Sequence, residues 1–144
     1  MSERMKSLLK ENSMCVLATS FENKPHCSLM AYVTDEDDVS TLFMVTLRSS
    51  RKFRNLSLNP HVSLLVDTRA DSKGGGDNIL ALTVSGVCSA LANRADKDLI
   101  LGRIVGAHPH LQDLAYHPDA EVISVRVETL LLLEGATTAH FEEQ

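Results

Sequence analysis

Thr46-Leu47-Arg48-Ser49-Ser50-Arg51-Lys52 is the stretch around which the rest of the chain is organised. It follows an apolar segment rich in β-branched residues and leads into residues 50–58, whose apolar positions have helical spacing. Ser49 or Ser50 can cap that helix, and Asn59-Pro60 ends it. The stretch therefore predicts a strand followed directly by a helix.

Two cations, Arg51 and Lys52, fall in the first turn of this helix. The amino end of a helix has unpaired N–H groups and a partial positive charge, so it favours anions. Cations there cost roughly a few tenths of a kcal/mol. A bound phosphate would offset that cost, whereas two solvated cations that tolerate it are the alternative. From these residues alone, both interpretations stay open.

Composition limits the class of protein. The chain has 144 residues, with 44% apolar and 23% charged side chains, which predicts one globular domain over residues 1–144. A net charge of −5 argues against a nucleic-acid binder, and a local cluster of cations then suits a small anionic ligand. There is no apolar run of membrane-spanning length and no signal-peptide pattern. We therefore expect a cytoplasmic protein.

The cysteines support the same compartment. Cys15, Cys27 and Cys88 are odd in number, and no two form a C-x-x-C pair. Each lies in an apolar run, which predicts buried, reduced thiols in a reducing compartment.

Hydrophobic patterning predicts a mainly β fold. Six strands are expected, at residues 14–20, 26–34, 39–46, 62–68, 79–91 (interrupted at Gly86) and 121–134. Helices are expected at residues 2–11, 50–58 and 94–105, with a second short helix after Pro109. Strands joined by hairpins indicate an antiparallel sheet, and six of them can close into a small barrel. The leucine run within residues 125–133 is expected to be buried on both faces.

The sequence contains neither a phosphate-binding P-loop nor the motif of a hydrolase nucleophile. Gly74-Gly75-Gly76 is not a phosphate-binding P-loop, because Lys73 precedes the glycines instead of following them. We expect a hairpin loop there, with a lid over the ligand as the alternative. No nucleophile-elbow motif is present, so a hydrolase is not expected.

The run Thr46-x-x-x-Ser50-Arg51-Lys52, between a strand and a helix, resembles the phosphate-binding segment of the pyridoxamine-phosphate-oxidase-like, FMN-binding split-barrel family. Residues 15–20 and 25–32 look like the first hairpin of that family, and residues 55–67 continue the match. The resemblance covers about residues 4–91. It implies a six-stranded antiparallel split β-barrel (α+β, mainly β) with flanking helices, in agreement with the strands predicted above.

The resemblance also implies a cofactor site. Arg51 and Lys52 would bind the phosphate of FMN, with hydroxyl contacts from Thr46 and Ser50, and residues 28–32 would lie along the isoalloxazine ring. The implied cofactor-binding residues are Ser28, Leu29, Met30, Ala31, Tyr32, Val45, Thr46, Ser50, Arg51 and Lys52. The family typically binds two flavins at a two-fold interface, so a homodimer is implied. Flavin carries the electron chemistry itself, and no catalytic residue is assigned.

This chain departs from the oxidase pattern at three places. Ser28 stands where the oxidases have an arginine, and Val33 stands at a substrate-contacting lysine position. The C-terminal arginine segment that recognises pyridoxal phosphate is missing. The substrate of the true oxidase is therefore not expected. Loss of one phosphate-binding arginine, worth roughly 1.5–3 kcal/mol, also lowers the expected FMN affinity.

The second half of the chain more loosely resembles the haem-utilisation relatives of the same fold. The resemblance rests on residues 106–110, 116–119 and 133–135. Those relatives bind haem and can degrade it, which makes haem the alternative cofactor, and Arg48 could serve a haem propionate.

A metal site is not expected at His108, His110 and His117. Pro109 prevents the first two from sharing a helix face, and no carboxylate or cysteine lies at a recognised companion spacing. Histidines in loops or at helix caps are the expectation.

The hypothesis is an FMN-dependent oxidoreductase that exchanges electrons with a small-molecule donor and acceptor, without nucleic acid or membrane. The alternatives are a haem-handling protein, a flavin-binding protein without turnover, and a barrel that dimerises but binds nothing.

Overall fold

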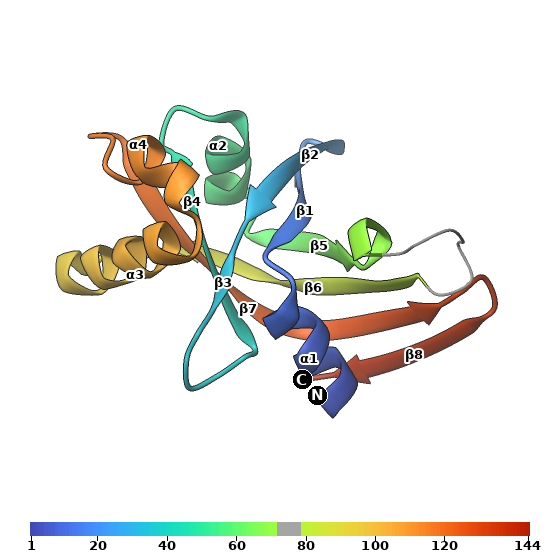
Figure 1. Ribbon diagram of the computed structural model, residues 1–144. Helices are drawn as coiled ribbons and strands as arrows, with labels where there is room; N and C mark the ends of the chain where they lie inside the picture. The colour runs from blue at the N-terminus through green and yellow to red at the C-terminus, as the bar shows by residue number, and fades with distance from the viewer. Residues whose placement is uncertain (72–78) are drawn as a thin grey trace.

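A single curled antiparallel sheet forms the centre of the computed structural model, which describes residues 1–71 and 79–144 (Figure 1). Its strands are β1 (Met14–Phe21), β2 (Lys24–Ala31), β3 (Val33–Thr34), β4 (Thr41–Leu47), β5 (His61–Asp67), β6 (Leu80–Ala90), β7 (Ala120–Glu134) and β8 (Thr138–Glu143). Their order is β2-β1-β5-β6-β7-β4-β3, and β8 pairs with β7. The predicted fold class, a mainly β split barrel with flanking helices, is confirmed. The predicted loop at Gly74-Gly75-Gly76 lies outside the described residues.

The sheet has eight strands where six were expected. The expected strand at residues 26–34 divides at Tyr32, whose N–H donates to the Ser13 carbonyl (2.9 Å) before the chain joins β4. β8 was missed. The chain reverses at Gly135 (φ 64°), and residues 138–143 then pair with β7. Because β8 is almost entirely exposed, it has no hydrophobic alternation to reveal it.

The two ends of the sheet meet because the chain runs directly from β2 into β3. β2 lies at one end of the strand order, while β3 and β4 lie at the other. Tyr32 is the one residue between β2 and β3. The sheet therefore curls into a barrel, and β2 and β4 lie next to each other without appearing as paired neighbours in the described sheet. We call this gap the split.

Helices lie at both ends of the sheet (Figure 1). α2 (Arg51–Leu58), α3 (Arg94–Ala107) and α4 (Gln112–Ala115) lie towards one end, and α1 (Glu3–Glu11) lies beside the two chain termini. Short 3-10 turns are η1 (Arg69–Asp71) and η3 (Pro109–Leu111). The three longer predicted helices are confirmed, and the short one after Pro109 starts as η3 and continues as α4. No helix in the described ranges is long and apolar enough to cross a membrane.

Buried side chains form two clusters. One fills the barrel and includes Leu17, Met44 and Leu82, each fully buried. The other lies between the outer face of β4 and β7 and the helices α3 and α4, and it includes Val122 and Ile104. Because of this second cluster, residues 42–46 of β4 are buried on both faces. The split lies at the border between the two clusters.

Two expectations about burial were wrong. The leucine run of β7 buries mainly one face, since Leu130 and Leu132 are buried while Leu133 is 40% exposed. Residues 120–125 of β7 are the part covered on both sides, because α3 and α4 pack there. Cys27 is exposed, because it points outward from the edge strand β2. Burial raises the pKa of Cys15 and of Cys88 to about 12, so both are inert thiols at neutral pH.

Candidate functional site

A hollow of about 230 Å³ lies at the split. β2, β4, the start of α2 and the segment from η3 to α4 each contribute to its wall. It is lined by Leu29, Met30, Ala31, Val45, Thr46, Leu47, Ser50, Lys52, Leu111 and Leu114. We call it the split pocket. Seven of the ten residues implied by the sequence resemblance meet here, although they come from two separate stretches of the chain.

The polar end of the split pocket is built around Ser50. Its side chain caps α2 by accepting from the N–H of Phe53 (3.2 Å), and its oxygen lies 3.0 Å from the hydroxyl of the buried Thr46. With Thr46 as donor, the Ser50 oxygen accepts two hydrogen bonds and its own O–H stays available for a ligand. Thr46 thus fastens the end of β4 to the start of α2.

Donors gather at the same point. Among the described contacts, the backbone N–H groups of Arg51 and Lys52 have no acceptor, as is usual for the first residues of a helix. The side chain of Lys52 lines the split pocket. Two free N–H groups, a hydroxyl and an ammonium group can together bind an anion.

The apolar end of the split pocket includes the open edge of β2. Tyr32 donates its N–H to Ser13, and Met30 is paired with Cys15. Because hydrogen bonding alternates along an antiparallel pair, the N–H and C=O groups of Leu29 and Ala31 face away from β1. A strand edge that presents donors and acceptors away from its neighbour suits a planar heterocycle that carries both kinds of group.

Three residues implied by the resemblance do not line the split pocket. Tyr32 is 2% exposed, and its hydroxyl donates to the Leu9 carbonyl (2.8 Å). Burial raises the pKa of Tyr32, and the nearby Cys15 adds to this. Ser28 is half-buried on the same strand face as Met30. Arg51 lines a different hollow, on the side of α2 that faces the β1–β2 hairpin.

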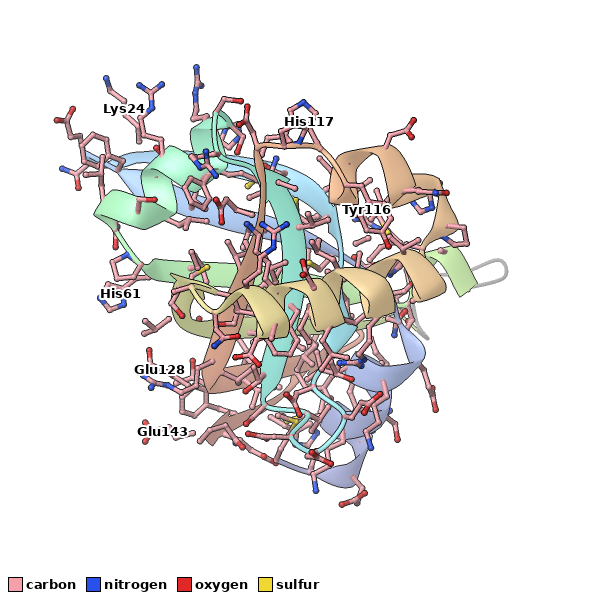
Figure 2. The ribbon with its side chains drawn as sticks, turned by 90° about the vertical axis from the view of Figure 1, so that its left-hand side faces the viewer. Lys24, His61, Tyr116, His117, Glu128 and Glu143 are labelled. Atoms are coloured by element: carbon pink, nitrogen blue, oxygen red, sulfur yellow. The ribbon has the colours of Figure 1, made fainter. Side chains whose placement is uncertain are left out.

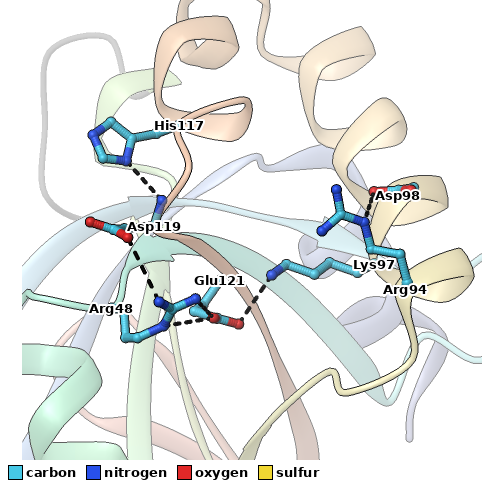
Figure 3. Close-up of polar contacts among 7 residues, drawn as sticks. All are labelled: Arg48, Arg94, Lys97, Asp98, His117, Asp119 and Glu121. Atoms are coloured by element: carbon cyan, nitrogen blue, oxygen red, sulfur yellow. Dashed lines mark hydrogen bonds and ion pairs between the residues drawn. The ribbon is translucent and has the colours of Figure 1, made fainter.

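Arg48 is held in an ion-pair network (Figure 3). Its guanidinium lies 2.7 Å from Glu121 and 3.7 Å from Asp119, and Lys97 of α3 lies 3.3 Å from the other Glu121 oxygen. Partial burial raises the pKa of Glu121, but hydrogen bonds from Arg48 and Lys97 outweigh that effect and hold it below its ordinary value. Arg48, Arg51 and Lys52 are close in the sequence, but their side chains lie at different places in the fold.

The three histidines considered as possible metal ligands, His108, His110 and His117, have contacts within the fold. His108 is buried at the end of α3, and its Nε2–H donates to the Tyr32 carbonyl (3.1 Å). His117 accepts the N–H of Asp119 at Nδ1 (3.0 Å; Figure 3). His110 packs edge-on against His108. Within residues 1–71 and 79–144, no three potential metal ligands converge.

Sequence reasoning missed three residues of the split pocket. Leu47 follows Thr46 directly, while Leu111 and Leu114 belong to η3 and α4. The short helix predicted after Pro109 contains the latter two, but no local signal indicates that this helix covers the split.

The fold and the hollow at the split define a split-barrel protein with an open half-pocket. The family model for pyridoxamine 5'-phosphate oxidase matches residues 1–134, and the chain belongs to this family. No curated protein matched the sequence.

Solved structures of similar shape include haem-binding and flavin-binding proteins. A haem-binding protein from Mycobacterium smegmatis has a TM-score of 0.81 at 15% identity, covering 99% of this chain and 58% of its own length. The haem storage protein HutZ from Vibrio cholerae has a TM-score of 0.74 at 18% identity, covering 92% of both chains. An FAD-binding protein from Mesorhizobium loti has a TM-score of 0.72 at 17% identity, covering 92% of this chain and 94% of that chain. At these identities the likeness concerns the fold alone.

Proposed function

We propose that the protein binds FMN in the split pocket and acts as an oxidoreductase on a small-molecule electron donor and acceptor. The observation that carries the proposal is the composition of this one hollow. It joins an anion-binding end, made by Ser50, Lys52 and the start of α2, to the open edge of β2. FMN has the same two parts, a phosphate and a planar ring with alternating donors and acceptors.

FMN would supply the electron-transfer chemistry when bound, and the chain would bind and orient it. Lys52 is the one ionisable side chain among the residues that line the split pocket. No carboxylate, histidine or cysteine is among those lining residues. The proposed roles are therefore charge pairing by Lys52, hydrogen bonding by Ser50 and the β2 edge, and water exclusion by Leu111 and Leu114.

The flavin would lie at a homodimer interface. The split pocket encloses about 230 Å³, below the roughly 300–1,000 Å³ of typical small-molecule sites. One chain would therefore leave part of the ring in water. Leu29, at the rim, is 73% exposed, and a second copy of the chain that covers it would complete the site.

Haem is less well supported at this position. No histidine is among the residues that line the split pocket, so haem iron would have no imidazole ligand from this wall. The absorption spectrum of the purified protein separates the two cofactors, because flavin gives two visible bands and haem gives a Soret band. A haem spectrum would contradict the flavin proposal.

FMN titration, followed by quenching of flavin fluorescence, tests the role of Lys52. Loss of a charge-assisted contact costs roughly 1.5 kcal/mol or more, so Lys52→Gln should weaken FMN binding about tenfold. Lys10→Gln removes one exposed cation on α1 and should leave the affinity unchanged.

Riboflavin supplies the second arm of this titration. It lacks the phosphate, so Lys52→Gln should not change its affinity. Equal FMN affinity in Lys52→Gln and the wild type, or an equal loss with riboflavin, would refute the phosphate assignment.

A further inference from the structure

A second hollow, of about 410 Å³, lies between the β1–β2 hairpin and α2. The residues of interest in its wall are Glu22, Lys24, His26, Arg51, Arg54 and Asn55. It shares no lining residue with the split pocket. We call it the basic hollow. In Figure 2, Lys24 marks the hairpin corner of the molecule, with its side chain pointing outward.

Helix and strand periodicity explain why these basic groups converge. Arg51, Arg54 and Asn55 are spaced three and four apart, so they share one face of α2. Lys24 and His26 are two apart on β2, so they share one face of the strand. The two faces approach each other because α2 packs on β1.

The wall of the basic hollow is fastened by a buried hydrogen bond. Asn55 is 8% exposed, and its side-chain amide donates to the hydroxyl of the buried Thr19 (3.2 Å). This bond joins α2 to β1 at a residue that lines the basic hollow. The hairpin and the helix are therefore held in register without any help from Lys24, Arg51 or Arg54.

The positive charge of the basic hollow is not neutralised. In the described part of the chain, Lys24, Arg51 and Arg54 have no carboxylate within 4.0 Å, whereas Arg48, Arg94 and Arg103 each have one. α2 has no acidic residue in its first turn. Glu22, at the hairpin tip, is the one carboxylate in the wall, set against three permanent cations.

Such a cluster is costly without an anion. Like charges repel one another, and cations near the start of α2 also oppose the helix dipole. The chain carries a net charge of −5, so a general excess of basic residues does not explain this cluster.

We propose that the basic hollow binds the phosphate group of a small phosphorylated molecule, at a site separate from the split pocket. Two arginines offer planar forks that match phosphate oxygens, and Lys24 and His26 add donors from the opposite wall. The volume lies within the range of small-molecule sites. A bounded hollow on an acidic protein suits a small ligand better than a nucleic-acid backbone. This inference does not depend on the flavin proposal.

Calorimetric titration of the full chain with inorganic pyrophosphate, at low ionic strength, tests the inference. We expect binding that is about tenfold weaker in Arg54→Gln and in Lys24→Gln, and that Lys52→Gln, at the anion-binding end of the split pocket, leaves in place. Lys10→Gln is the control for net charge and should bind as the wild type does. Using one variant on α2 and one on the hairpin separates loss of the site from local misfolding.

Three outcomes would overturn the inference: no binding of pyrophosphate to the wild type, an equal loss in Lys10→Gln, or Arg54-dependent binding of a single-stranded oligonucleotide without binding of pyrophosphate. Failure of the flavin proposal is distinguishable, because Lys52→Gln reports on FMN while Arg54→Gln reports on pyrophosphate. AMP and inorganic phosphate, titrated in parallel, would show whether a nucleoside adds to the affinity for the phosphate group.

Discussion

Ser50 serves two elements with one oxygen. It accepts the N–H of Phe53 to start α2, and it pairs with Thr46 at the end of β4. A cap of this kind typically stabilises a helix by about 1 kcal/mol. The same oxygen sits beside two free N–H groups, so the helix start is both a structural joint and the polar end of the split pocket.

Glu121 joins three elements in a similar way, and its contribution should depend on pH. It pairs with Arg48, after β4, and with Lys97 of α3 (Figure 3). Its pKa lies below the ordinary value of 4.5 in the folded state. Such a carboxylate stabilises the fold above the pKa of the unfolded chain, and this stabilisation is lost as the pH falls through the folded pKa.

Glu121→Gln should therefore lower the free energy of unfolding by about 1 kcal/mol at neutral pH. The difference from the wild type should shrink as the pH falls below 4.5, because the wild-type carboxyl then takes up a proton. Urea unfolding at a series of pH values measures this. Asp98→Asn, which breaks the exposed pair with Arg94, should have a much smaller effect. A deficit in Glu121→Gln that persists unchanged in acid would point to packing and not to charge.

At the scale of elements, β6 and β7 decide the shape of the sheet. Their register shifts between Ser85 and Gly86, which leaves Glu128 as the extra residue of a bulge in β7. β6 itself runs without a break through Gly86, so the predicted interruption is a shift in pairing and not an end of the strand. A bulge bends the ladder, which helps the sheet to curl towards the split.

Gly86→Ala should destabilise the barrel. A Cβ at this position would lie 2.3 Å from the Arg126 carbonyl oxygen, so the two strands would have to move apart. Overpacking of this kind costs roughly 1–3 kcal/mol. Gly102→Ala is the matched control in α3, where a Cβ meets nothing within 4 Å. It should stabilise the protein by up to about 1 kcal/mol, because alanine is the better helix former. Equal thermal midpoints for the two variants would contradict this account.

Large apolar side chains are exposed on several elements of the molecule, and two of them lie on clearly different surfaces. Leu29 lies at the rim of the split pocket, and Leu99 lies on α3, each about two-thirds or more exposed. The dimer proposed above would cover Leu29 and would leave Leu99 in water. These two leucines therefore make a matched pair for testing the assembly.

Sedimentation equilibrium at micromolar protein should give about twice the chain mass of 15.8 kDa. Leu29→Glu should shift the protein towards the monomer, since burying an unpaired carboxylate opposes association. Leu99→Glu should leave the dimer intact. A wild-type monomer, or equal weakening by both variants, would contradict an interface at the split.

Local patterns in the sequence were sufficient for most of the elements. Strand and helix periods depend on residues a few positions apart, so the helix start at Ser50 and the strands around it could be predicted. The stretches around Leu29 and Thr46 were assigned to one site through a family resemblance, and the split brings them together. β8 was missed because its exposed residues carry no apolar period.

Only the tertiary structure decided where the cations go. Arg48, Arg51 and Lys52 are neighbours in the chain, yet they reach Glu121, the basic hollow and the split pocket, respectively. Arg48 and Glu121 are 73 positions apart, and the pairing of β4 with β7 is what brings them together. A charged side chain pairs with the opposite charge that the fold places beside it. The helix and strand periods of the sequence connect only residues a few positions apart, so they do not encode such a distant partner. The sequence alone determined that this strand is followed by a basic helix start, and the topology of the sheet divided its cations among three sites.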